Sequence, residues 1–264
     1  MTEVYWKSAR LAAGGAAFAL AVGMVATSAT MAADAAPESL LKAMSDYMAA
    51  QNSISFNYDS NLEIVTVEGQ KLGLASSGAI QISRPDKIHA TRTGGFADVE
   101  LTFDGKTLTL LGKNMNLYTQ AELPGTLDTL VDQIRDKYNR PLPAADLIMS
   151  NPYQELMADV KDVKDLGSGV IRGQECDHLA FRNDDVDWQI WIAQGDKPYP
   201  CRYVITSTKV DRAPQYTIDV RDWNASTEAS SVDFSFTPPA DAKLATPDDL
   251  KDFDELPSHF MPKS

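Results

Sequence analysis

The sequence predicts an α+β protein built on one strongly curved antiparallel β-sheet, an open half-barrel with helices covering its concave face. Two runs of alternating apolar and polar residues support this prediction, one over residues 53–120 and one over residues 160–224, and a helical insert separates them. Strands, then helices, then strands again are typical of α+β architecture. One face of the first run is polar, which indicates that only the other face is covered.

Helices are predicted at both ends of the first run. Residues 37–50 begin with a Pro suited to a first turn and carry apolar residues at helical spacing. Residues 124–138 are the clearest helix, with acidic residues away from the apolar stripe. Asn151 is a capping residue for a short helix through residue 157, and the segment 142–150 is compatible with a helix.

The strands alternate with turns of identifiable chemistry. The expected strands are 53–67, 70–83, 87–92 and a following hairpin in the first run, and 160–166, 169–174, 176–182, 186–193, 201–208 and 214–224 in the second. Asp104-Gly105 predicts a two-residue turn in that hairpin, because Gly allows the positive φ of a tight type I′ turn.

The N-terminus has the features of a cleavable export signal, which we assign to residues 1–33. Lys7 and Arg10 precede an uncharged stretch rich in Ala, Gly, Leu and Val, and small residues occur just before Asp34. A retained membrane anchor is the alternative, because no charge occurs between Arg10 and Asp34. With cleavage, the mature protein is periplasmic and has no stable membrane anchor.

Length and charge narrow the range of partners. The chain has 264 residues and a formal net charge of −13. Such an acidic protein repels phosphate backbones and anionic membrane surfaces, so neither nucleic acid nor direct membrane docking is expected. We expect one domain over residues 34–245 and an acidic extension over residues 246–264.

Cys176 and Cys201 are the only cysteines. In an exported chain two thiols predict a disulfide, which would stabilise the fold by about 3–4 kcal/mol on the chain-entropy model. In a simple meander, however, these cysteines lie on strands one apart, too far to bond unless the sheet curls. Two buried thiols are the alternative.

Four segments resemble a bacterial family of predicted periplasmic proteins and, with it, the LolA and LolB lipoprotein carriers. They are 83–95 (SRPDKIHATRTGG), 101–110 (LTFDGKTLTL), 176–200 (CDHLAFRNDDVDWQIWIAQGDKPYP) and 234–242 (FSFTPPADA). The carriers contain a similar strand, Asp-Gly-Lys turn and returning strand, and Phe-x-Phe-x-Pro-Pro is similar to their closing strand and turn. The resemblance implies an open barrel with a helical lid over a hydrophobic cavity that shields acyl chains from water.

The resemblance also implies which residues line that cavity. An acyl chain gains about 0.8 kcal/mol for each CH₂ removed from water, so an apolar cup suffices to bind it. Candidate lining residues on strands are Phe56, Tyr58, Leu62, Leu101, Phe103, Leu108, Leu110, Trp188 and Ile190, and those on the lid are Leu127, Leu130, Val131 and Ile134. Ordinary core packing is the alternative for each.

No residue cluster predicts catalysis, a cofactor or a metal. Cys176 and His178 face the same way on a strand, but no metal-ligand spacing accompanies them, so His178 is interpreted as a structural residue hydrogen-bonded in the sheet. The acidic turn at 183–187 lacks the Gly and the distant Glu of a calcium loop. Trp188 and Trp191 point to opposite faces of one strand, so one of them is expected in the core.

Two hypotheses for the function follow. The first is a non-enzymatic periplasmic carrier or sensor that binds a lipid, an acylated peptide or a lipoprotein in the half-barrel. The second is an interaction or sensor module that recognises another envelope protein and whose cavity is filled by its own helices. An apolar cavity above about 300 Å³ distinguishes the first from the second.

Overall fold

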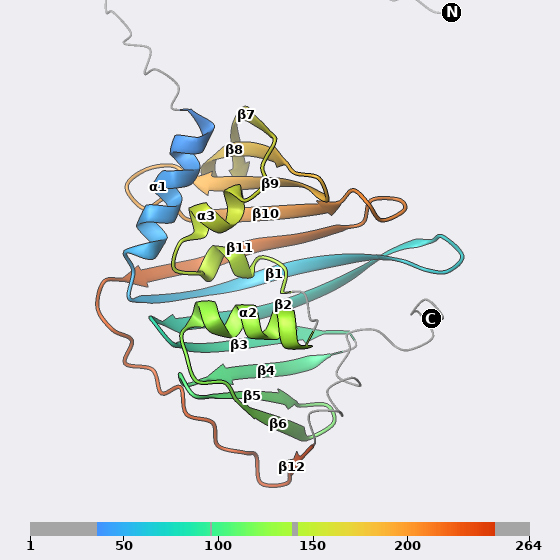
Figure 1. Ribbon diagram of the computed structural model, residues 1–264, viewed down its shortest axis with the longest axis vertical. Helices are drawn as coiled ribbons and strands as arrows, with labels where there is room; N and C mark the ends of the chain where they lie inside the picture. The colour runs from blue at the N-terminus through green and yellow to red at the C-terminus, as the bar shows by residue number, and fades with distance from the viewer. Residues whose placement is uncertain (1–35, 96, 139–141, 246–264) are drawn as a thin grey trace, which may run out of the picture. The chain divides into compact units, whose positions relative to one another are not determined.

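The computed structural model describes residues 36–95, 97–138 and 142–245. These residues form one open, curved sheet of twelve strands with helices on one face (Figure 1). The predicted signal at 1–33 and the acidic extension at 246–264 lie outside the described residues. None of the described helices is long and apolar enough to cross a membrane.

The first six strands form the predicted meander. They are β1 (Ser53–Val65), β2 (Lys71–Ser83), β3 (Lys87–Gly94), β4 (Asp98–Phe103), β5 (Thr107–Gly112) and β6 (Leu117–Glu122), and each pairs antiparallel with the next. The predicted two-residue turn at Asp104-Gly105 is wrong, because Phe103 pairs with Leu108 across a longer loop. Gly105 has a positive φ of 95°, but Asp104 does not; its carboxylate instead accepts hydrogen bonds from backbone N–H groups of the loop.

The second meander joins the first through its last strand. It contains β7 (Asp162–Ile171), β8 (Gln174–Arg182), β9 (Val186–Ala193), β10 (Pro200–Ser207) and β11 (Gln215–Ser226), and β11 pairs with β1. The two strands predicted over 160–174 are the single strand β7, where a register shift between Asp165 and Ser168 accommodates the glycine between them.

The chain after β11 does not form the closing strand that the resemblance implies at 234–242. Phe234 is buried there without strand pairing, and the Phe236 ring packs against Tyr118 of β6 at 5.4 Å. A two-residue strand, β12 (Lys243–Leu244), then pairs parallel with β6.

The helices all lie in front of one face of the sheet in Figure 1: α1 (Pro37–Ala49), α2 (Leu127–Tyr138), the 3₁₀ helix η1 (Ala145–Ile148) and α3 (Pro152–Met157). The helices α1 and α3 follow their predictions closely, and α2 begins three residues later than expected. Within the segment 142–150 only η1 is helical, as a 3₁₀ helix of four residues. Asn151 caps α3 as predicted, since its side chain accepts a hydrogen bond from the backbone N–H of Gln154 at 3.2 Å.

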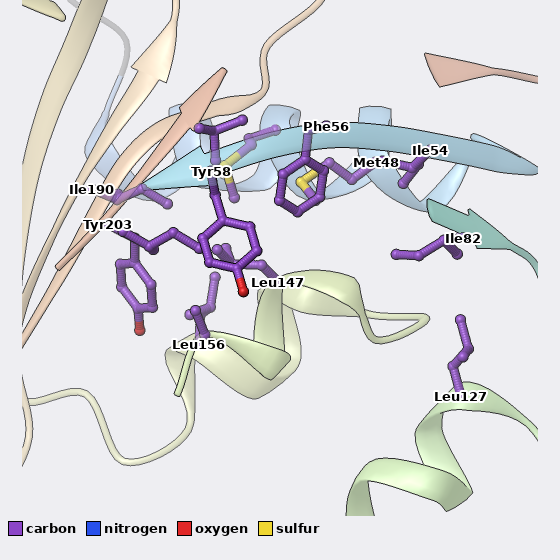
Figure 2. Packing of buried hydrophobic residues seen from close by; sticks show 14 of the residues in the cluster. Met48, Ile54, Phe56, Tyr58, Ile82, Leu127, Leu147, Leu156, Ile190 and Tyr203 are labelled. Atoms are coloured by element: carbon purple, nitrogen blue, oxygen red, sulfur yellow. The ribbon is translucent and has the colours of Figure 1, made fainter. Parts of the chain in front are cut away.

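The core lies between these helices and the sheet face that they cover, which we call the helix face. Sheet residues such as Ile54, Phe56 and Ile82 pack there against Met48 of α1 and Leu127 of α2. Figure 2 shows these side chains gathered between the strands and the helices. Because side chains alternate along a strand, the pairing register assigns each strand residue either to the helix face or to the opposite, outer face.

Candidate ligand-binding face

The register arranges the helix face of β1 and β2 in rows. Starting from the end nearest α1, the paired residues are Ile54–Ile82, Phe56–Ile80, Tyr58–Gly78, Ser60–Ser76, Leu62–Leu74 and Ile64–Leu72. The rows are therefore apolar at both ends of the hairpin and polar between them. The helices cover the first end, and the hairpin extends beyond α2 at the second (Figure 1).

Most of the predicted lining residues belong to the covered end. Nine of the thirteen are buried: Phe56, Tyr58, Phe103, Leu127, Leu130, Val131, Ile134, Trp188 and Ile190. Eight of these nine share one core cluster, and Val131 packs in a smaller cluster with Ala145 and Met149. We call the helix-face residues of this core cluster the covered region.

The remaining four predicted lining residues, Leu62, Leu101, Leu108 and Leu110, are only half-buried. Leu101 and Leu108 pack against the edge of the core cluster. Leu62 pairs with Leu74, and the next row is Ile64 with Leu72; all four of these side chains are half-buried. We call Leu62, Ile64, Leu72 and Leu74 the open region.

The outer face of the same hairpin has a different composition. On β2, Gly73 lies between Leu72 and Leu74, and Ala75 and Ser77 follow on the same outer face; all three are exposed. The large apolar side chains at this end of β2 are therefore confined to the helix face, whereas the outer face carries small and polar residues together with Val65 of β1. The alternation of these residues was predicted, but only Leu62 was among the predicted lining residues; its pairing with Leu74 identifies the second residue.

Tyr58 marks the boundary between the two regions. Its hydroxyl donates a hydrogen bond to the carbonyl oxygen of Thr91 on β3 at 3.0 Å, so its ring lies across β2. Gly78 makes room for the ring: a Cβ there would lie 1.9 Å from the Thr91 oxygen and 2.6 Å from Tyr58 Cζ. In the next row the hydroxyls of Ser60 and Ser76 are 2.8 Å apart and share a hydrogen bond.

Arg92 extends the row of Tyr58 and Gly78 onto β3, where it pairs with Gly78 on one side and Val99 of β4 on the other. It is half-buried on the helix face. Arg92 was not among the site residues predicted from the sequence. The alternation Ile88, Ala90, Arg92 along β3 is the signal that could have identified it.

The outer face is polar and contains its own network. A hydrogen bond from Ser77, together with the guanidinium groups of Arg221 and Arg172, holds the pKa of the Asp59 carboxyl below its ordinary value. An open pocket of about 420 Å³ lies beside this network, between the β7–β8 turn and residues 220–222 of β11. None of the predicted lining residues contributes to it.

Two interpretations of side chains in the second meander are confirmed. The His178 ring is 2.9 Å from the side-chain oxygen of Gln189 and stacks on Trp191 at 3.9 Å, as expected of a structural histidine in the sheet. Trp188 is buried in the core, whereas Trp191 is on the outer face. Within the described ranges, no three His, Cys, Asp or Glu side chains are grouped to hold a metal.

Cys176 and Cys201 are on β8 and β10, with β9 between them, yet their Sγ atoms are only 2.6 Å apart. A register shift between Pro200 and Arg202 accompanies this approach, so the cysteines are close in space although a strand lies between theirs. Both are buried free thiols, and burial raises the pKa of each. The disulfide itself stays a prediction.

The family model DUF2092, described as a predicted periplasmic protein, matches residues 37–246. The chain belongs to this family. The resemblance to a periplasmic family is thus confirmed, and with it the periplasmic location predicted from the export signal. No curated protein matches the sequence significantly.

Several solved structures are similar to this DUF2092 chain at low identity. Lipoprotein LppX of Mycobacterium tuberculosis is 12% identical with a TM-score of 0.42, over 75% of this chain and 97% of LppX. An uncharacterized conserved protein from Thermus thermophilus is 10% identical with a TM-score of 0.46, over 79% and 98% of the two chains. LolA superfamily protein NE2245 from Nitrosomonas europaea is 10% identical with a TM-score of 0.36, over 75% of this chain and 97% of NE2245. The predicted LolA-like fold is seen in the chain itself, as an open antiparallel sheet with helices on one face.

Proposed function

We propose that this DUF2092 protein is a non-enzymatic periplasmic binding protein whose ligand is apolar: a lipid, or the acyl chains of an acylated peptide or lipoprotein. The ligand contacts the open region of the helix face. The observation that carries the proposal is the one-sided composition of the β1–β2 hairpin, where Leu62, Ile64, Leu72 and Leu74 are half-buried on one face and small residues are exposed on the other.

The energetics favour a ligand at these residues. Fully burying a Leu or Ile side chain contributes about 1.5–3 kcal/mol, and a half-buried side chain has gained only part of it. An acyl chain laid along the two apolar rows would bury the remainder. Tyr216 and Ile205 continue the row of Leu62 onto β11 and β10, where both are half-buried and pack against the core cluster, so the open region is continuous with the core.

A second function is favoured by the covered region. There Met48 of α1, Leu147 of η1 and Leu156 of α3 pack against the sheet, so the protein fills that part of the face with its own side chains (Figure 2). A protein filled in this way would serve as an interaction or sensor module. Its open region would then contact another envelope protein instead of a lipid.

Native mass spectrometry of protein exported to the periplasm separates the two functions. We expect an additional mass of lipid size that is lost on denaturation and that identifies the ligand class. A bare protein mass, with no uptake from a lipid mixture, would contradict the first function and favour the second. The denatured mass also reports whether the predicted signal at 1–33 is removed.

A further inference from the structure

Arg92 has an unusual position on the helix face. Among the paired residues of β1 to β6, the helix face carries Ile54, Phe56, Tyr58, Ser60, Leu62, Ile64, Leu72, Leu74, Ser76, Gly78, Ile80, Ile82, Ile88, Ala90, Arg92, Gly94, Val99, Leu101, Phe103, Leu108, Leu110, Gly112, Leu117, Thr119 and Ala121. Arg92 is the only charged residue in this set. Every other charged residue in the paired segments of these strands is on the outer face.

The surroundings of Arg92 are polar on one side and apolar on the other. Tyr58, whose ring lies across Gly78, is in the same row, and the Ser60–Ser76 hydroxyl pair is in the next row. Beyond the hydroxyls come the two apolar rows of the open region. From the row of Arg92 to the row of Ile64 is six residues of β1, about 20 Å. One leaflet of acyl chains, half of a hydrocarbon core, measures about 15 Å.

The spatial order of a cation, two hydroxyls and an apolar surface matches an amphiphile with a negatively charged head. The Arg92 guanidinium is half-buried among helix-face side chains that carry no other charge, so it offers a charge-assisted hydrogen bond to an anion placed there. Carboxylate and phosphate oxygens are the partners that its planar fork binds best. A lipid with such a head would place its charge at Arg92, its polar linkage at the hydroxyls and its chain on the open region.

The structural alternative is that Arg92 serves only the fold. The 12 residues of α2 span about 18 Å from the β2–β3 turn, which brings the end of the helix near the row of Arg92. A guanidinium there could stabilise helix carbonyls. Arg92 also already interacts within the chain, so an incoming anion would have to join or displace that partner.

We infer that the ligand is an anionic lipid whose carboxylate or phosphate head pairs with Arg92 while its acyl chain lies on Leu62, Ile64, Leu72 and Leu74. This inference rests on the proposed function and specifies its ligand class. The net charge of −13 opposes docking of the protein on an anionic bilayer. A single lipid is a different case, because charges more than about 8 Å away are largely screened at physiological salt. The nearby Arg92 guanidinium therefore has the larger effect on binding of one anionic head.

A matched pair of fluorescent ligands tests the charge requirement: cis-parinaric acid and its methyl ester, titrated into full-length protein at a pH well above the pKa of a fatty acid. We expect the acid to bind about tenfold more tightly than the ester. Arg92→Met should lower the affinity for the acid to that for the ester and leave the affinity for the ester unchanged. Arg92→Lys should keep most of the preference for the acid over the ester. Lys71→Met is the control, because it removes one positive charge from the outer face of the same hairpin.

The outcomes separate the inference from the function on which it rests. Equal binding of acid and ester by the wild type would overturn the inference and leave the proposed function standing. An Arg92→Met variant that loses both ligands equally would assign Arg92 to the fold and also overturn the inference. Binding of neither ligand by the wild type would count against the proposed function itself. The wild-type ratio requires no variant, so the test holds even if Arg92→Met does not fold.

Discussion

The covered and open regions belong to the same two strands and differ in what lies over them. In the covered region Ile54 and Ile82 are 2% and 1% exposed, whereas Leu62 and Leu74, two rows beyond Tyr58, are half-buried. The 13 residues of β1 extend about 44 Å, while α2 is about 18 Å long. One amphipathic strand thus supplies both a core wall and a half-exposed surface, because the helices are shorter than the strands that they cover.

Leu130→Asp gives the largest expected effect, because it places a carboxylate in the covered region. Leu130 is 3% exposed and packs in the core cluster. An unpaired buried charge costs several kcal/mol, a large share of the roughly 5–15 kcal/mol by which domains are stable. We expect loss of the folded state by circular dichroism. Thr129→Asp is the matched control: its side chain is exposed in the first turn of α2, where an acidic residue is favourable.

A Leu130→Asp protein that melts like the wild type would show that α2 does not cover the sheet. The division of the face into covered and open regions would then have no basis.

Gly78→Ala tests the boundary between the regions. The new Cβ would lie 1.9 Å from the backbone oxygen of Thr91, which cannot retreat without disturbing the β2–β3 pairing. We expect a loss of about 1–3 kcal/mol or more, the usual cost of overpacking, measured as a lower urea midpoint. Gly73→Ala on the outer face of β2 is the control, since its Cβ would meet only the mobile end of the Asn61 side chain. Equal midpoints for the two variants would argue against a close passage of Tyr58 over β2.

Oxidation of Cys176 and Cys201 should stabilise the protein without changing ligand binding. The cysteines are 25 residues apart in sequence, for which the chain-entropy model gives about 3.5 kcal/mol. They lie in a small cluster with Ile171 and Ala193, separate from the open region. We expect a higher melting temperature for exported protein than for reduced protein, equal lipid uptake by both, and no response to reductant in Cys201→Ser. Full alkylation of both thiols in denatured, unreduced protein would end the disulfide prediction.

The fold was largely predictable because the relevant information is local. Period-two alternation and turn residues identify the six strands of the first meander, and Pro37 and Asn151 mark helix starts. The single strand β7 was predicted as two strands, 160–166 and 169–174, because Gly167-Ser168 interrupts the strand pattern; in the structure Gly167 has a φ of 80° and lies within an irregularity in the pairing with β8.

The candidate face was less predictable because it depends on pairing between distant residues. The apolar pattern selects Phe56 and Leu62 equally, yet only the packing of α1, α2, η1 and α3 decides that one is buried and the other half-exposed. The approach of Cys201 to Cys176 likewise depends on a register shift in β10 that no local motif reports. Arg92 is identified as a candidate ligand contact only once the strand pairing shows which residues lie in its row and in the next rows.

Leu62→Ser has the smallest expected effect on stability and the most specific effect on function. A half-buried leucine contributes less than the 2–5 kcal/mol lost when a fully buried one is truncated, so we expect a loss of about 1 kcal/mol. Lipid uptake in native mass spectrometry should fall about tenfold, because about 1.4 kcal/mol of apolar contact is removed from the ligand. The double variant with Leu74→Ser should fall further but less than additively, since the two residues are paired.

Val67→Ser is the control for this series, because Val67 lies at the tip of the same hairpin, is 62% exposed and is outside the paired rows. Replacing the Val67 side chain should leave lipid uptake unchanged. If the double variant kept a full load of lipid, the ligand would have to lie among residues of the covered region, and the helices would have to move to admit it. The contrast between the two regions would then describe two states of one cavity rather than a core and a binding surface.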